Sequence, residues 1–323
     1  MGDVFHIFGA CRISFVSHII KVDLMLSDKS LKVLLQLNLA AALCHLALVV
    51  AIAEVANLSL TLPVYSQQLT FVYDSSGAQE GFDLLPRLTK IATSFPLSAL
   101  VLFIEAVTAL VHLGNVFLWT PIYITFVENY MNPLRWCEYA ITAGTMGAVV
   151  AFTSGVRDLT VLVTAGALVA CLQAFGFLTE VVNRVQNGRW TIKQTWARLL
   201  PQALGYPLFA LWVYIILYTF IYAGGAPCTD WFVTAVVVGE IALFASFTAP
   251  ALYVYTHAPG DYAFGEKLYI ILSLTSKAFL AIVLLIGTLQ QTTFDGASVD
   301  QESTDRCPLL DVNGTNITIF DVY

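Results

Sequence analysis

One lysine inside a long apolar run is the residue whose chemistry most needs a partner. Lys277 lies within residues 268–289, which carry no other charged side chain. This run is long enough to cross the roughly 30 Å hydrocarbon core of a bilayer, which places the lysine near mid-membrane. An ammonium group there costs roughly 2.5–3.5 kcal/mol on insertion scales. Lys277 therefore predicts an ion pair with a buried carboxylate, a substrate or proton path, or a Schiff base with a carbonyl cofactor.

Glu138 is the carboxylate that best fits the role of partner. It follows Arg135 by three residues and precedes Thr142 by four, so the three side chains share one face of a helix. The functional interpretation is a counter-ion, Glu138, with Arg135 organising the charge at the cytoplasmic mouth of the site. The alternative is an ordinary Arg-Glu pair at the surface, near the start of the helix.

Other acids also lie in apolar runs. Glu105 precedes His112 by seven residues, with Thr108 between them on the same face, and Glu240 lies in the middle of a later run. Both acids are either protonated and hydrogen-bonded within the bundle or, for Glu105, part of a proton path toward the outside. Three acids near the ends of the runs are expected to face water: Glu54, Glu180 and Glu266.

The composition predicts a polytopic membrane protein. Hydrophobic residues make up 58% of the 323 residues and charged residues only 11%, whereas soluble domains carry about 25% charged residues. The sequence contains no basic cluster, which argues against nucleic-acid binding. It also shows no hydrolytic nucleophile-base pair, phosphate loop or metal cluster, so we do not expect an enzyme.

Seven apolar runs predict an all-α membrane protein with seven transmembrane helices. They cover residues 31–53, 88–117, 134–154, 159–181, 199–223, 231–255 and 268–289. Pro96 is expected to kink the second helix, and Asn132-Pro133 supplies a cap and a first-turn proline for the third. The predicted organisation is a lead-in over residues 1–30, with a helix on the membrane surface, then a bundle over 31–290 and a tail over 291–323.

The loop at residues 54–87 predicts a small extracellular β-ribbon between the first two helices. It contains two short β-like stretches followed by the turn formers D-S-S-G. Lysine and arginine then set the orientation, with nine on the side of the N-terminus against four on the other. The nine are Arg12, Lys21, Lys29, Lys32, Arg184, Arg189, Lys193, Arg198 and Lys267, and the four are Arg87, Lys90, Arg157 and Arg306. This bias predicts a cytoplasmic N-terminus and an extracellular C-terminus.

The glycosylation sequons and the cysteines give further predictions that depend on this topology. Three N-x-S/T sequons fall on predicted outer segments, at Asn57, Asn313 and Asn316. Cys228 and Cys307 are both placed outside, which predicts a disulfide that ties down the tail, with two free thiols as the alternative. Three more cysteines fall inside apolar runs and are expected to pack as small hydrophobic residues: Cys44, Cys137 and Cys171.

Two motifs together resemble the heliorhodopsins. The last helix contains S-x-x-x-K, at Ser273 and Lys277, and the third begins with R-W-x-E-Y, which ends on Glu138 and Tyr139. The inverted topology and the structured first loop also match that family. The resemblance implies all-trans retinal as a Schiff base on Lys277, Glu138 as primary counter-ion, Ser273 beside the Schiff base, and a homodimer in membrane lipid. It also implies a polar cavity on the cytoplasmic side of the Schiff base, which His45 and His112 fit.

Aromatic residues are candidates for the wall of the retinal slot, with ordinary packing as the alternative: Tyr206, Phe209, Phe244 and Phe247. The leading function is a light sensor whose signalling partner the sequence does not identify. A second hypothesis is light-dependent passive proton transport that uses Glu105, Glu240 and the histidine cavity. A third is a transporter or receptor without a chromophore, in which Lys277 binds a carboxylate ligand.

Overall fold

The computed structural model describes residues 28–59, 61–74, 81–222, 229–289, 310–312 and 315–317. Several predictions fall outside these residues: the surface helix of the lead-in, the pairing of Cys228 with Cys307, and the Asn313 sequon. Two short strands, β5 (Leu310–Val312) and β6 (Thr315–Ile317), pair in the tail.

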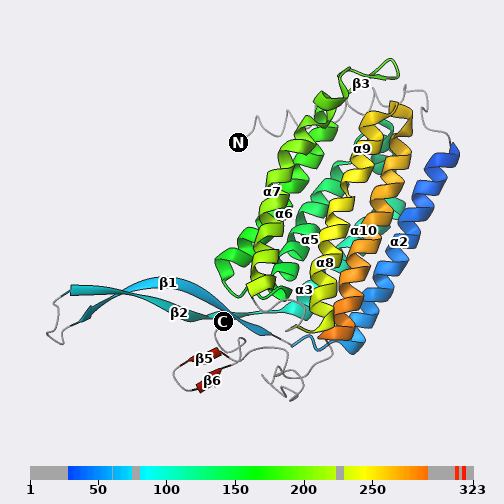
Figure 1. Ribbon diagram of the computed structural model, residues 1–323. Helices are drawn as coiled ribbons and strands as arrows, with labels where there is room; N and C mark the ends of the chain where they lie inside the picture. Colours follow the sequence, from blue (N-terminus) through cyan, green and yellow to red (C-terminus); the bar gives the residue numbers. More distant parts are fainter. Residues whose placement is uncertain are drawn as a thin grey trace, which may run out of the picture.

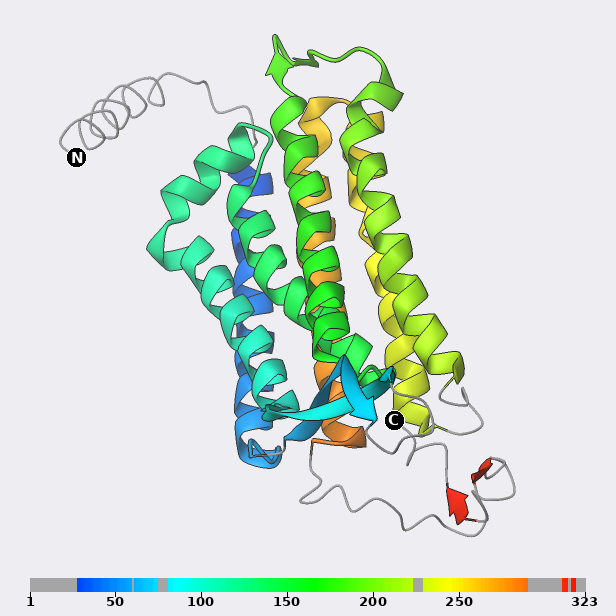
Figure 2. The same ribbon diagram turned by 90° about the vertical axis from the view of Figure 1, so that its left-hand side faces the viewer.

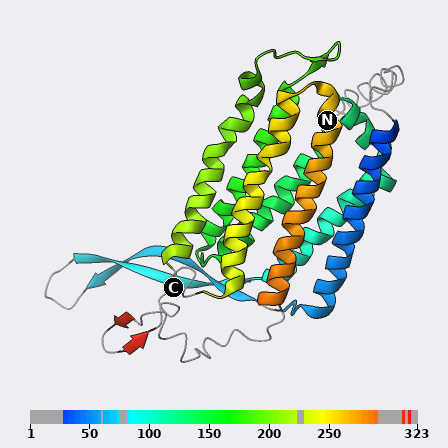
Figure 3. The ribbon, with the colours of Figure 1, turned by 45° about the vertical axis from the view of Figure 1, so that its right-hand side comes forward.

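Long helices lie side by side in one bundle (Figure 1). They are α2 (Asp28–Val55), α3 (Leu97–Leu113), α5 (Pro133–Thr153), α6 (Leu159–Val182), α7 (Thr195–Tyr222), α8 (Trp231–Ser246), α9 (Thr248–Thr256) and α10 (Tyr262–Gly287). Helices α8 and α9 follow each other with a break at Phe247, and Pro250 explains the break because it cannot donate a backbone hydrogen bond to residue 246. Helix α10 lies between α8 and α2 (Figure 3).

Six helical stretches among the described residues are long and apolar enough to cross a membrane. They are Lys29–Val55, Leu97–Leu118, Leu159–Val182, Thr195–Tyr222, Trp231–Thr256 and Pro259–Gly287. The protein is therefore an integral, multi-pass membrane protein. Helix α5 is not in this set, because its 21 residues include Arg135, Glu138 and several threonines and glycines. It packs against α3, α6 and α8 within the bundle, and its role as a seventh span stays a prediction.

Two long strands lie between α2 and α3. Strand β1 (Leu62–Asp74) pairs antiparallel with β2 (Gly81–Phe95), from Leu62 opposite Phe95 to Asp74 opposite Gly81. We call the end of the bundle from which they project the ribbon end (Figure 1). Because β2 continues to Phe95, the helix starts at Leu97 rather than at residue 88, and the loop does not end at 87.

Pro96 marks the start of α3 and does not kink it, so that prediction was wrong. The residue before the first helical turn needs no intrahelical N–H donor, which makes proline compatible with this place. Residues 88–95 contain isoleucine, phenylalanine and two threonines, which favour a strand, and with Lys90 and Ser94 they are less apolar than the helix that follows.

A π-helical turn, η1 (Gly114–Leu118), continues α3, and a helix that the sequence did not predict follows it, α4 (Thr120–Glu128). The helix axis changes direction there (Figure 2). A Cβ atom on Gly114 would lie only 1.9 Å from the Trp119 ring, so glycine allows this close approach. The same end of the bundle carries a hairpin, β3 (Val185–Gln186) and β4 (Arg189–Trp190), and we call it the hairpin end.

The start of α5 agrees with the sequence prediction. The Asn132 side chain accepts a hydrogen bond of 3.2 Å from the backbone N–H of Arg135, and Pro133 is the first helical residue. This cap fixes where α5 begins, and so it sets Glu138 about one and a half turns inside the helix.

Cys44, Cys137 and Cys171 are free thiols exposed on the bundle surface, so the expectation that they pack inside was wrong. Hydropathy alone does not separate a helix face that meets lipid from one that meets other helices, because both environments are apolar.

Candidate functional site

A buried ion pair joins α10 to α5. Lys277 Nζ lies 2.7 Å from Glu138 Oε1, and only 3% and 4% of the two side chains are exposed. Lys277 Nζ also donates a hydrogen bond of 2.9 Å to Ser273 Oγ, one turn earlier in α10. The Tyr139 ring lies beneath the ammonium group, with its centroid 4.9 Å from Nζ. The structure thus brings Ser273 and Lys277 of one sequence motif together with Glu138 and Tyr139 of the other.

Two threonines hold the Glu138 carboxylate in place. Thr142 Oγ1 donates to Glu138 Oε1 over 2.7 Å, and Thr108 Oγ1 donates to the same oxygen over 2.9 Å. The oxygen that meets Lys277 therefore also receives one bond from its own helix and one from α3. Three hydrogen-bond donors on Glu138 Oε1, one of them Lys277 Nζ, hold the carboxylate with its negative charge next to the lysine nitrogen.

An aromatic cavity begins beside this pair and extends between α5, α6, α7, α8 and α10. All four aromatic residues proposed from the sequence line it, namely Tyr206, Phe209, Phe244 and Phe247. Trp136, Tyr139, Met146 and Tyr269 also contribute to the wall, and α10 adds Ser273, Ser276 and Lys277. A slot of this kind suits an elongated apolar molecule with one reactive end at the lysine.

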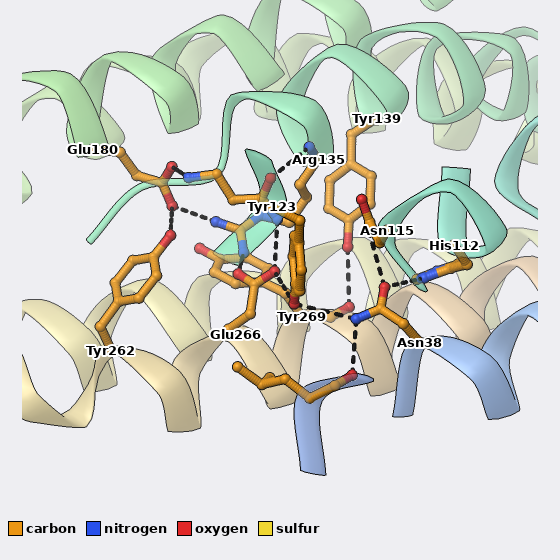
Figure 4. A network of polar contacts seen from close by, with 12 residues as sticks. Asn38, His112, Asn115, Tyr123, Arg135, Tyr139, Glu180, Tyr262, Glu266 and Tyr269 are labelled. Atoms are coloured by element: carbon orange, nitrogen blue, oxygen red, sulfur yellow. Dashed lines mark hydrogen bonds and ion pairs between the residues drawn. The ribbon is translucent and has the colours of Figure 1, made fainter. Parts of the chain in front are cut away.

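Arg135 does not meet Glu138, which corrects the predicted arrangement. It forms ion pairs with Glu180 of α6 and Glu266 of α10 (Figure 4). The Arg135 side chain is 5% exposed and each of the two glutamates 2%. The expectation that Glu180 and Glu266 face water was therefore wrong, because three helices that are distant in sequence bring these charges together at the hairpin end. Glu54 is exposed, as predicted.

Neutral donors complete this cluster of Arg135, Glu180 and Glu266. Tyr262 donates through its hydroxyl to Glu180 over 2.9 Å. Asn132 donates through its backbone N–H to Glu180 over 2.7 Å and through its side chain to Glu266 over 2.6 Å. The cap residue of α5 thus also binds both carboxylates. Two carboxylates and one guanidinium leave the cluster dependent on Arg135 for charge compensation.

A second set of polar side chains follows the contact between α2 and α3. His45 Nδ1 lies 2.5 Å from Glu105 Oε2, and the His45 ring stacks on His112 with 5.9 Å between centroids. His112 Nδ1 lies 2.8 Å from Asn38 Oδ1, two helical turns before His45 in α2. His45 therefore lies between Glu105 and His112, bonded to the acid and stacked on the other ring, and all of these side chains are buried.

This polar chain continues toward the hairpin end (Figure 4). Asn115 donates to Asn38 over 3.0 Å, and Asn38 donates to the Tyr123 hydroxyl over 3.2 Å. Tyr123 in turn donates to Glu266 over 3.4 Å. Sequence reasoning missed Asn38, Asn115 and Tyr123. The seven-residue spacing of Asn38 and His45 was a usable signal, because it repeats the spacing of Glu105 and His112 on the facing helix.

Glu240 lies apart from this chain. Ser276 Oγ donates to Glu240 Oε2 over 2.9 Å, so this acid of α8 contacts the residue immediately before Lys277 in α10. Glu240 is fully buried, and its other oxygen has no partner within the part of the chain that the structure describes. The structure thus does not join Glu240 to Glu105.

Comparison with protein-family models gives a match over most of the chain. The family model for heliorhodopsin matches residues 34–289 of the 323. No curated protein matches the chain. The matched region runs from the second turn of α2 to just beyond the end of α10 and so includes the ion pair, the aromatic cavity and the polar chain.

Proposed function

This chain belongs to the heliorhodopsin family, which implies a retinal-binding, light-responsive membrane protein, and we propose that it is a light sensor with retinal attached at Lys277. The observation that carries this proposal is the buried Lys277–Glu138 pair, whose lysine lines an aromatic cavity. A lysine that only balanced a charge would not need a slot of this kind beside it. Family membership also favours retinal over a chromophore-free transporter or receptor.

The residues of the cavity fit all-trans retinal chemically. Retinal is an elongated, apolar polyene with one aldehyde, and the cavity offers aromatic walls and one primary amine. When bound, it would condense with the Lys277 amine with loss of water, as a Schiff base, and supply absorption of visible light and photoisomerisation. Phe244 and Phe247 of the α8–α9 region and Tyr206 and Phe209 of α7 are the proposed wall residues.

Glu138 is the proposed counter-ion. Its carboxylate keeps a positive charge at the Lys277 nitrogen stable in a site that excludes water. Thr142 and Thr108 hold the carboxylate in one orientation, and Ser273 accepts a hydrogen bond from the same nitrogen. Any movement of positive charge away from Glu138 weakens this pair and changes the proton affinity of both partners together.

The absorption spectrum of the protein expressed with all-trans retinal tests the proposal. We expect a visible band for the native chain and none for Lys277→Ala, because the alanine variant has no amine to hold the aldehyde. Lys267→Ala is the matched control, since this lysine lies near the start of the same helix, away from the cavity. A visible band that survives Lys277→Ala would refute attachment at this residue.

A second candidate function is passive, light-dependent proton transport. The polar chain from Glu105 through His45 and His112 to Asn38 supports it. Thr108 and Glu138 adjoin this chain from the Lys277 side, since Thr108 lies on α3 between Glu105 and His112. No residue pattern specifies a switch against backflow, so we expect protons to move down their electrochemical gradient. A branch through Glu240 stays a prediction, supported only by its contact with Ser276.

Glu105→Gln should reduce light-induced currents and keep the absorption band. Glutamine has nearly the same shape but cannot exchange a proton with His45, whereas the Lys277–Glu138 pair is untouched. The measurement is photocurrent in voltage-clamped cells across a series of pH gradients, with Glu54→Gln as a control at an exposed acid of α2. If Glu105→Gln conducts normally, or if the native protein shows no photocurrent at any voltage or gradient, the transport proposal fails and the sensor stands alone.

A further inference from the structure

Three buried polar atoms toward the ribbon end have no hydrogen-bond partner within residues 28–289 as far as the structure describes them. They belong to Ser98 (Oγ), Glu105 (Oε1) and Thr288 (Oγ1). Ser98 and Glu105 are fully buried and Thr288 is 3% exposed. Buried hydroxyl and carboxyl groups are nearly always bonded to protein or to water, and leaving one unbonded costs about 1–3 kcal/mol.

These groups lie between the middle of the bundle and its ribbon end. Ser98 is in the first turn of α3, immediately after β2, and Glu105 follows seven residues later on the same helix face, about 10 Å along the axis. Thr288 caps α10 at its last turn. The next residue, Leu289, accepts a backbone hydrogen bond of 2.7 Å from Asn57, just beyond α2, so the ends of α2 and α10 meet there.

Hydrogen bonding on the hairpin-end side of Glu105 differs from that on its ribbon-end side. From His112 toward the hairpin end the polar side chains bond to one another, through Asn38 and Tyr123, whereas His45 only stacks on His112 and its Nε2 atom has no partner among the described residues. Toward the ribbon end no described side chain bonds the free Glu105 oxygen, and Val101 lies between Glu105 and Ser98 on the same face. Protein hydrogen bonds therefore connect the polar groups from His112 to the hairpin end, and the groups from Glu105 to the ribbon end need a different hydrogen-bonding partner.

We propose that water fills this gap, in a narrow vestibule that enters at the ribbon end between α2, α3 and α10, passes Ser98 and reaches Glu105. Water is the ligand that satisfies single hydroxyl groups in such sites, provided that each molecule finds two to four polar partners. Ser98, Thr288 and Glu105 are those partners. The inference rests on the proposed proton transport for its purpose, since the vestibule connects Glu105 to the membrane surface, but its existence requires neither light nor retinal.

Thiol accessibility tests the vestibule directly. In a background with all six native cysteines replaced by serine, Ser98→Cys and Ile104→Cys are each treated with a small, charged, water-soluble thiol reagent in lipid nanodiscs. Both positions are buried, at 0% and 1% exposure, but Ile104 belongs to the apolar core beside Glu105. We expect Ser98→Cys to react roughly tenfold faster, because only a hydrated thiol ionises and meets the reagent.

Thr288→Cys serves as a second reporter on another helix and should also react faster than Ile104→Cys. Equal, slow rates at Ser98, Thr288 and Ile104 would overturn the vestibule. A thermal melt of each variant before labelling distinguishes water access from unfolding, since an unfolded Ser98→Cys protein would lose its cooperative transition. If Ser98→Cys fails this check, the labelling rate of Thr288→Cys relative to Ile104→Cys decides whether the vestibule exists.

A current measurement separates this inference from the function on which it rests. Ser98→Ala should lower the photocurrent and leave the visible band in place, because it removes a water partner far from Lys277. Fast labelling without any photocurrent would leave the vestibule standing and refute proton transport. Slow labelling with normal, Glu105-dependent currents would refute the vestibule and leave transport standing.

Discussion

Arg135→Met should lower the free energy of unfolding by about 3–5 kcal/mol, which is the usual loss when one partner of a buried ion pair is removed. Methionine fills much of the same space but leaves Glu180 and Glu266 facing each other without a cation. Both carboxylates are 2% exposed, so water cannot take over the role of the guanidinium. The loss can be measured by denaturant titration of the purified protein in detergent.

Two further variants make this test specific. Arg184→Met removes an exposed arginine at the same end of the bundle and should change stability little. Combining Arg135→Met with Glu180→Gln and Glu266→Gln should recover a large part of the loss, because the unpaired charges are gone. A loss for Arg135→Met no greater than that for Arg184→Met would show that the three residues do not form a buried cluster.

Glu138→Gln should shift the visible band of the retinal-bound protein to longer wavelength. With less negative charge near the Lys277 nitrogen, positive charge spreads further along the conjugated chain. The pH at which the visible form is lost should fall by roughly two to four units, since a buried partner worth about 3–5 kcal/mol no longer favours the protonated form. Spectra recorded across a pH titration give both values.

Glu240→Gln is the matched control for this second prediction. Glu240 is also a buried glutamate near Lys277, but it meets Ser276 and not the lysine nitrogen. We expect its replacement to change the band and the titration much less than Glu138→Gln. The opposite result, a large shift for Glu240→Gln with Glu138→Gln close to native, would assign the counter-ion to α8.

The pairing of Lys277 with Glu138 could be predicted from sequence because one charge in an apolar helix is a conspicuous signal. Lys277 needed an anion, and Glu138 was the acid placed best by its own helix, about one and a half turns from a capped start. The contacts of Arg135 could not be found in this way. Local spacing favoured Glu138, three residues along, but Glu180 and Glu266 reach Arg135 from two other helices.

The helices could be predicted where hydropathy alone identifies an apolar helix. They were predicted less well where the sequence is compatible with either a strand or a helix. The sequence prediction extended the helix back to residue 88, but residues 88–95 belong to β2, which pairs with β1, and the helix starts only after Pro96. Helix α4 was missed because the π-helical turn at Gly114 ends the regular periodicity. Asn38 and Tyr123 passed unnoticed because a single neutral polar residue in an apolar run gives little sign of a network.

The site of retinal attachment is the central claim, and mass mapping tests it most directly. The purified protein is regenerated with all-trans retinal, treated with borohydride to make the linkage permanent, digested and analysed by mass spectrometry. The proposed function predicts one retinyl group, on the peptide that contains Lys277, and none on that peptide in Lys277→Ala. Retinyl mass on another lysine, or on no peptide while the visible band is present before reduction, would contradict it.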